Sequence, residues 1–143
     1  MTKIKREALV MYSSKQMYDI VNDVNAYCTY LPNCQKSKII EQTESLLVGQ
    51  LTLGKGALNI SFTTKNSLKP FESITLLLHD GPFKNLNGVW YFESLNERAC
   101  KIRFELSFEA NALFKLAAKT LLTQMADQMV QSFIKRADQL YLQ

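Results

Sequence analysis

The side chains best suited to chemistry are a single histidine, His79, and three cysteines, Cys28, Cys34 and Cys100. A zinc site needs four such ligands, and because no two of these cysteines have CxxC spacing, we expect no metal site. A nucleophilic cysteine needs a basic partner, and His79 is the only histidine available. We therefore interpret the cysteines as small buried hydrophobes and His79 as a turn residue at the end of a strand.

Motifs of the common enzyme classes are absent from the sequence. It contains no GxSxG nucleophile motif, no glycine-rich phosphate loop and no paired-carboxylate signature. Glu105 and Glu109 fall on the polar side of an alternating segment, where they face solvent. We expect a protein that is not an enzyme and that requires no cofactor.

Length and composition indicate one domain spanning residues 1–143. The chain is 47% apolar and 21% charged, and a domain of this length buries roughly 68–70% of its unfolded surface without disulfides. An odd number of scattered cysteines favours a reducing compartment. Because the sequence shows neither a secretory signal nor about 18 consecutive apolar residues, we expect a soluble cytoplasmic protein.

The net charge of +4 and the pI near 9.0 favour anionic partners but are too low for a dedicated DNA-binding protein. Scattered solvated lysines are one interpretation, and a surface for RNA or anionic lipid headgroups is the other. The candidate patches are Lys3, Lys5 and Arg6 with Lys36 and Lys38, or Lys135 and Arg136.

The N-terminal part combines one strand with two short helices. Side chains alternate over 3–11, and Ser13 followed by Gln16 forms the capping box that begins a helix. Asn25 is expected to cap a second short helix that reaches Leu31.

The middle of the chain has the two-residue period and short turns of an antiparallel meander. The expected strands are 37–41, 46–53, 57–68, 73–79, 86–95 and 99–109. From about Asn111 to the C-terminus the period becomes helical, with no glycine or proline to interrupt it, for roughly 45 Å. The fold class is therefore α+β: a curved seven-stranded antiparallel sheet wrapped around a long C-terminal helix, with the two short helices sealing one end.

A sheet that grips a helix in this way can enclose a cavity. Methionines and aromatic residues on the inner faces either fill the space as ordinary core or form an adaptable wall around an apolar ligand. The candidate wall residues are Phe62, Leu76, Leu78, Trp90, Phe92, Phe104, Phe108, Leu122, Met125, Met129 and Phe133. Three further candidates sit where a ligand would enter or where the core would be plugged: Tyr27, Leu31 and Phe83.

Several motifs spread over nearly the whole chain resemble one known family. They are 21–27 (VNDVNAY), 31–34 (LPNC), 62–66 (FTTKN), 80–84 (DGPFK) with Leu86, Gly88, Trp90 and Phe92, 100–109 (CKIRFELSFE), and the helix segment 129–133 (MVQSF) with Arg136, Ala137 and Tyr141. Together they resemble the START-like, helix-grip group of coenzyme Q-binding proteins and RatA ribosome-association toxins. Cys28, Asn33 and Ala110 depart from the usual pattern, mainly in the entrance loop.

The resemblance implies a non-catalytic carrier or chaperone that binds ubiquinone, or another apolar isoprenoid, between sheet and helix. The alternative that it implies is a toxin that binds the large ribosomal subunit and blocks subunit association. A cyclase-like enzyme is the third possibility, and it would need an acid or base inside the cavity. Fold alone does not choose among these functions.

Overall fold

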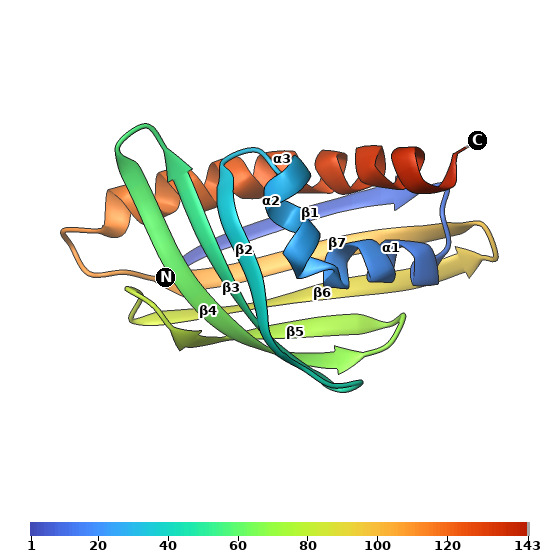
Figure 1. Ribbon diagram of the computed structural model, residues 1–143, viewed down its shortest axis with the longest axis horizontal. Coiled ribbons are helices and arrows are strands. Elements are labelled where there is room, and N and C mark those ends of the chain that lie inside the picture. The colour runs from blue at the N-terminus through green and yellow to red at the C-terminus, as the bar shows by residue number, and fades with distance from the viewer. Residues whose placement is uncertain (143) are drawn as a thin grey trace.

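Seven antiparallel strands form one sheet that bends around the C-terminal helix (Figure 1). The computed structural model describes residues 1–142. The strands are β1 (Thr2–Val10), β2 (Cys34–Gln42), β3 (Leu46–Lys55), β4 (Leu58–Lys69), β5 (Ser73–Asp80), β6 (Asn85–Asn96) and β7 (Ala99–Glu109). The helices are α1 (Ser14–Asn22), a 3-10 turn (Val24–Ala26), α2 (Tyr27–Tyr30) and α3 (Lys115–Tyr141).

The strand order is β1-β7-β6-β5-β4-β3-β2, with every neighbouring pair antiparallel. The expected meander from β2 to β7 is confirmed, and β1 joins it beside β7. On β7 the alternation places Ile102, Phe104 and Leu106 in the core. The α+β fold with a long gripped helix is therefore as the sequence predicts.

Helix α1 begins at the capping box that the sequence predicts. The backbone N–H of Gln16 donates to Ser13 Oγ at 3.1 Å, and the backbone N–H of Ser13 donates to Gln16 Oε1 at 3.0 Å. Two otherwise unpaired N–H groups are satisfied in this way, so the chain turns directly from β1 into a helix.

The second short helix differs from the expectation. It divides into the 3-10 turn and the single turn of α2, and Asn25 caps neither. Its Oδ1 instead accepts a hydrogen bond from the backbone N–H of Ile39 at 2.8 Å, which ties this segment to edge strand β2. That strand is irregular, with register shifts against β3 between Cys34 and Lys36 and between Ile39 and Glu41.

Helix α3 begins at Lys115, not near Asn111, because the preceding residues form a turn in which the N–H of Phe114 donates to the Asn111 carbonyl. Its 27 residues span about 40 Å. Its buried face includes Leu122, Met125 and Phe133. Leu140, expected on that face, is instead 48% exposed on the last turn of the helix.

Polar contacts fasten α3 along β1 and the residues that follow it. Arg6 donates from Nε to Asp127 Oδ1 at 3.0 Å, and the hydroxyl of Tyr12 donates to Asp138 Oδ1 at 2.5 Å. No helix within 1–142 has both the length and the hydrophobicity needed to cross a membrane.

Candidate functional site: the cavity between sheet and helix

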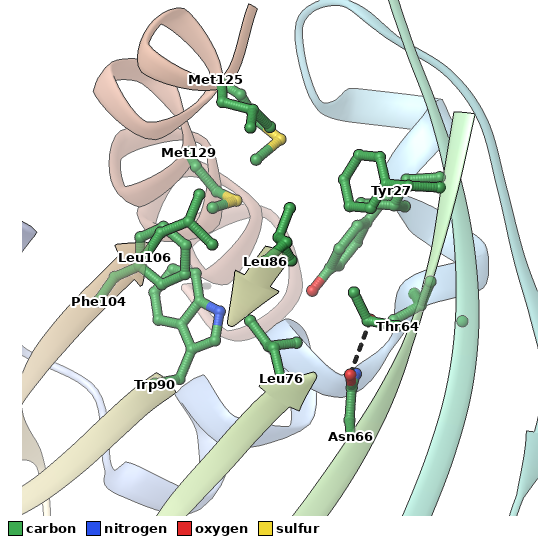
Figure 2. A pocket seen from close by; sticks show the side chains of 15 residues that line it. Tyr27, Thr64, Asn66, Leu76, Leu86, Trp90, Phe104, Leu106, Met125 and Met129 are labelled. Carbon is green, nitrogen blue, oxygen red and sulfur yellow. Dashed lines mark hydrogen bonds between the residues drawn. The ribbon is translucent and has the colours of Figure 1, made fainter. Parts of the chain in front are cut away.

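A small internal cavity of about 70 Å³ lies between α3 and the inner face of the sheet (Figure 2). Every strand from β3 to β7 contributes to its wall, together with α2, α3 and the 3-10 turn. The lining residues are Val24, Tyr27, Gly49, Leu51, Phe62, Thr64, Asn66, Leu76, Leu86, Trp90, Phe104, Leu106, Leu122, Met125 and Met129.

Local geometry explains why these residues meet. The two-residue period of β4 places Phe62, Thr64 and Asn66 on one face, turned toward the helix. Gly49 on β3 leaves room opposite them, because a Cβ at this position would lie 3.4 Å from Cγ1 of Val24 and 3.1 Å from Cδ2 of Leu47. Part of the cavity volume therefore exists because residue 49 is a glycine, which has no side chain.

Two polar residues of the cavity lie on one strand, β4. Thr64 Oγ1 donates to Asn66 Oδ1 at 2.8 Å, and both residues are buried (Figure 2). A buried hydroxyl and a buried amide cost free energy unless they are hydrogen-bonded, and this bond satisfies one group of each. None of the hydrogen bonds found within 1–142 uses the amide nitrogen of Asn66, so its N–H groups are available to a molecule in the cavity.

Tyr27 closes the side of the cavity nearest α2. Its hydroxyl donates to the carbonyl of Val21, so the ring is held in a fixed orientation. Burial raises the pKa of this hydroxyl well above its usual value, and Tyr27 is therefore a neutral hydrogen-bonding group at physiological pH.

Aromatic rings and thioethers form the opposite wall. The rings of Trp90 and Phe104 are stacked with centroids 4.3 Å apart, and Phe133 packs edge-on against Trp90 at 5.5 Å. The sulfur atoms of Met125 and Met129 lie above them (Figure 2). Methionine side chains change rotamer at low cost, so this wall is the one that can move.

The volume sets a limit on what the cavity holds. A cavity of about 150 Å³ is the size that binds benzene, and binding sites for larger ligands span roughly 300–1,000 Å³. At about 70 Å³ this cavity accommodates a few water molecules. A quinone ring enters only if the methionines and neighbouring side chains move outward.

The structure gathers part of the predicted wall around the cavity. The predicted residues that line it are Tyr27, Phe62, Leu76, Trp90, Phe104, Leu122, Met125 and Met129. The predicted residues that lie outside the lining are Leu31, Leu78, Phe83, Phe92, Phe108 and Phe133. Whether the lining binds a ligand stays a prediction.

Residues outside the lining have other packing partners. Phe83 lies among the rings of Phe62, Phe108 and Phe114, with centroids 5.6–6.1 Å away, and it plugs the end of the core beneath the start of α3. Of the two roles considered for Phe83, the structure therefore places it as the plug.

The remaining wall candidates support the cavity from behind or lie elsewhere. Phe133 packs behind the lining, between Tyr27 and Trp90. Phe92 packs against Tyr18 of α1, with ring centroids 5.6 Å apart. Leu31 is buried where α2 ends, and Leu78 is half-buried near the end of β5.

Some lining residues were not among the predicted wall. They are Val24, Gly49, Leu51, Thr64, Asn66, Leu86 and Leu106. The sequence could have predicted Thr64 and Asn66, because they continue the two-residue spacing of inward-facing residues that begins with Phe62. No sequence signal marks Gly49, whose role depends on a neighbour distant in the chain.

The candidates for chemistry lie apart from one another. Within the described chain, no three His, Cys, Asp or Glu side chains come together as a metal site would require. His79 is exposed on β5. Burial raises the pKa of the Cys34 and Cys100 thiols to about 11, consistent with a packing role. Cys28, also interpreted as buried, is instead exposed on α2.

The basic residues proposed as patches are divided among several surfaces. Lys3 and Lys5 lie on the outer face of the sheet, whereas Arg6 on the same strand turns toward α3 and pairs with Asp127. Lys36 and Lys38 lie on edge strand β2, at the opposite edge of the sheet from β1. Lys135 and Arg136 lie toward the C-terminal end of α3, where Arg136 packs over the Tyr30 ring.

Comparison with known proteins gives a consistent family. The family model described as "Polyketide cyclase / dehydrase and lipid transport" matches residues 10–134. The chain is 46% identical over 141 residues to the Ribosome association toxin RatA of Pseudomonas aeruginosa, covering 98% of each protein. It is 30% identical over 135 residues to the mitochondrial Coenzyme Q-binding protein COQ10 homolog B of Xenopus laevis, covering 91% of this chain and 55% of that protein.

A solved structure supports the fold independently. The Zhui aromatase/cyclase from Streptomyces superposes with a TM-score of 0.84 at 14% identity, covering 96% of this chain and 93% of that one. At this identity the similarity concerns architecture alone. The match to the family model and the similarity to RatA show that the chain belongs to the polyketide cyclase / dehydrase and lipid transport family, within the group that contains the RatA and coenzyme Q-binding proteins.

Proposed function

We propose that this protein associates with the ribosome, binding the large subunit and blocking its association with the small one. The observation that carries the proposal is the extent of the similarity to RatA, 46% identity over 98% of both chains. Similarity to the coenzyme Q-binding protein is lower, at 30%, and covers 55% of that longer protein.

Two physical features support a ribosomal partner over a carried lipid. The cavity of about 70 Å³ is too small for a quinone ring in the conformation described. The net charge of +4 favours association with an RNA-rich particle. Such binding releases counterions from RNA phosphates, so it weakens as salt is added.

The test is sedimentation of the purified protein with separated ribosomal subunits at low and high potassium chloride. We expect it to sediment with the large subunit at low salt and to reduce formation of complete ribosomes when small subunits are added. The small subunit alone is the control. Failure to sediment with the large subunit at low salt would contradict the proposal.

A second candidate function is binding of an isoprenoid quinone in the cavity. The observation that favours it is the amide of Asn66, which lines a mainly apolar cavity and whose N–H groups have no hydrogen-bond partner among the described residues, so that they fit a quinone carbonyl. The ring would take the place of the methionine side chains, which would turn outward. Ubiquinone is the ligand of this class that we propose.

Mass spectrometry of an organic extract tests this second function. Protein purified from its own host should carry a stoichiometric quinone, and Met125→Trp should abolish it by filling the cavity. Leu116→Trp adds the same ring on the exposed side of α3 and should retain the quinone. A folded wild-type protein without quinone would argue against this candidate.

A further inference from the structure

A second hollow, of about 780 Å³, lies on the outer face of the sheet, away from α3. Its floor is formed by β5, β6 and β7, and its sides by β1 and β4. Most of its lining residues, such as Lys3, Lys65 and Asn87, belong to the outward set of the two-residue alternation. Leu76 and Leu106 belong to the inward set and also line the internal cavity.

Strand register places lysines on opposite sides of this hollow. Across neighbouring strands, Lys3 pairs with Ser107, Ser107 with Asn87, Asn87 with Leu77, and Leu77 with Lys65. Four strand spacings of about 4.8 Å separate the two lysine backbones by about 19 Å. A row of neutral side chains thus lies between two positive groups from distant parts of the sequence.

The next row of outward-facing residues along the strands also begins with a lysine on β1. Lys5 faces Glu105, and the ion pair between them measures 3.5 Å. Glu105 is the one carboxylate in the hollow's lining and is paired with Lys5. Lys3 and Lys65 therefore leave the lining with a net positive charge. Hydroxyl groups of Thr75 and Ser67 complete this row.

An aromatic ring with an arginine on its face borders the same hollow. The guanidinium carbon of Arg103 lies 4.8 Å from the centre of the Tyr91 ring, and Tyr91 is half-buried on the outward side of β6. No ion pair involving Arg103 occurs among residues 1–142. Arginine and aromatic rings provide stacking surfaces for unpaired bases.

We infer that this outer face, bordered by Lys3, Lys65 and the Tyr91–Arg103 pair, is the surface that contacts ribosomal RNA. The inference rests on the proposed ribosome association and names the part of the fold that carries it. The separated lysines fit phosphates on either side of an RNA strand or an RNA groove. The neutral hydrogen-bond donors between them fit sugar and phosphate oxygens. A concave floor on which Ser107 and Asn87 lie beside Leu77 and Val89 fits a protruding RNA element better than a flat lipid surface.

The salt dependence of binding to large subunits tests the contacts. Wild type is compared with a double variant, Lys3→Gln with Lys65→Gln, over a range of potassium chloride. Losing two phosphate contacts should reduce the slope of log K against log salt by about 1.4–1.8. The matched control, Lys55→Gln with Lys84→Gln, removes two exposed lysines outside the hollow, one at the end of β3 and one just before β6, and should keep the wild-type slope.

A photoreactive residue at position 87, in the floor of the hollow, identifies the partner. We expect it to cross-link to RNA of the intact large subunit, and cross-links to ribosomal protein alone would overturn the inference. An unchanged slope in the Lys3/Lys65 variant would also overturn it while leaving ribosome association intact. If wild type itself fails to sediment with large subunits, the proposed function fails instead.

Discussion

At the scale of single residues, the polar pair of the cavity is the most informative feature. Thr64 and Asn66 are placed two residues apart on one strand, where apolar residues would pack more easily. Their bond removes part of the cost of burying polar groups, and the remaining N–H groups of Asn66 give the cavity its directional donor. The pair is therefore suited to orienting a guest, whether water or ligand.

This pairing predicts a non-additive effect on stability. Asn66→Leu leaves the Thr64 hydroxyl buried without its acceptor and should lower the free energy of unfolding by about 1–3 kcal/mol. The double variant Thr64→Val with Asn66→Leu replaces both partners and should be closer to wild type. Urea unfolding of wild type, both single variants and the double variant measures the coupling, and strictly additive losses would contradict it.

The cysteines differ in exposure and therefore in reactivity. With a pKa of about 11, the thiols of Cys34 and Cys100 are about one thousandth ionised at pH 8. Cys28 is exposed on α2. We expect iodoacetamide to label Cys28 first in the native protein and all three thiols in denaturant, as followed by peptide mass spectrometry. Raising the pH toward 11 should increase the thiolate fraction at the buried sites, and equal native labelling at pH 8 would contradict the assignment.

At the scale of elements, α3 is held more by its packed face than by its polar contacts. Phe133 is fully buried against the rings of Tyr27, Tyr30 and Trp90. The ion pair between Arg6 and Asp127 is largely exposed, and pairs of this kind contribute between about 0 and 1 kcal/mol. Aromatic packing in the C-terminal half of the helix therefore contributes more to its position than this ion pair does.

Truncation of the Phe133 side chain should strongly lower the stability of the fold. We expect Phe133→Ala to lower the free energy of unfolding by about 3–5 kcal/mol, because it removes a buried ring and leaves a cavity. Leu140→Ala, on the half-exposed last turn of the same helix, is the matched control and should cost much less. Chemical denaturation measures both, and similar losses would mean that helix propensity rather than packing dominates.

The elements themselves were readable from the sequence because their patterns are local. The capping box at Ser13, the alternation through Phe104 and the uninterrupted helical period after Asn111 each depend on nearby residues, and each predicts an element that the structure contains. The predicted start of α3 was wrong because residues 111–114 form a local turn that the helical spacing of apolar residues does not distinguish from a helix. The prediction that Asn25 caps a helix was wrong because its side chain accepts a hydrogen bond from Ile39, which lies on β2 and is distant in the sequence.

The candidate site was less predictable because it depends on contacts between distant segments. An inward-facing aromatic residue belongs to the core from its period alone, but whether it borders empty space depends on its neighbours. Phe108 and Phe62 share the inward pattern, yet Phe62 lines the cavity while Phe108 packs against Phe83. The hollow on the outer face depends in the same way on the pairing that aligns Lys3 with Lys65.

At the scale of the whole molecule, one sheet separates two environments. Its inner face packs against α3 around a small cavity, and its outer face carries the larger charged hollow. The two can serve separate roles because alternate residues of the same strands face opposite sides. A change on the outer face therefore need not disturb the core.

The expectation that residues 1–143 form one domain predicts a single unfolding transition. Trp90 is the chain's one tryptophan and is 3% exposed beside the cavity. Its fluorescence should shift to longer wavelength at the same urea concentration at which the circular dichroism of helix and sheet is lost. Two separated midpoints would contradict one cooperative unit spanning the chain.

The arrangement around strand β2 bears on how the molecule avoids self-assembly. An open sheet ends in a strand with unpaired backbone groups, and such an edge is a template for strand addition and fibril growth. Here the side chain of Asn25 accepts a hydrogen bond from the backbone N–H of Ile39, so this N–H is not free to pair with another strand. The register shifts on either side interrupt the regular spacing of backbone groups along β2. Lys36 and Lys38 add charge repulsion between copies. The short helical segment after α1 thus protects the margin of the sheet, and a chain lacking the Asn25 carboxamide would be more prone to polymerise through that margin.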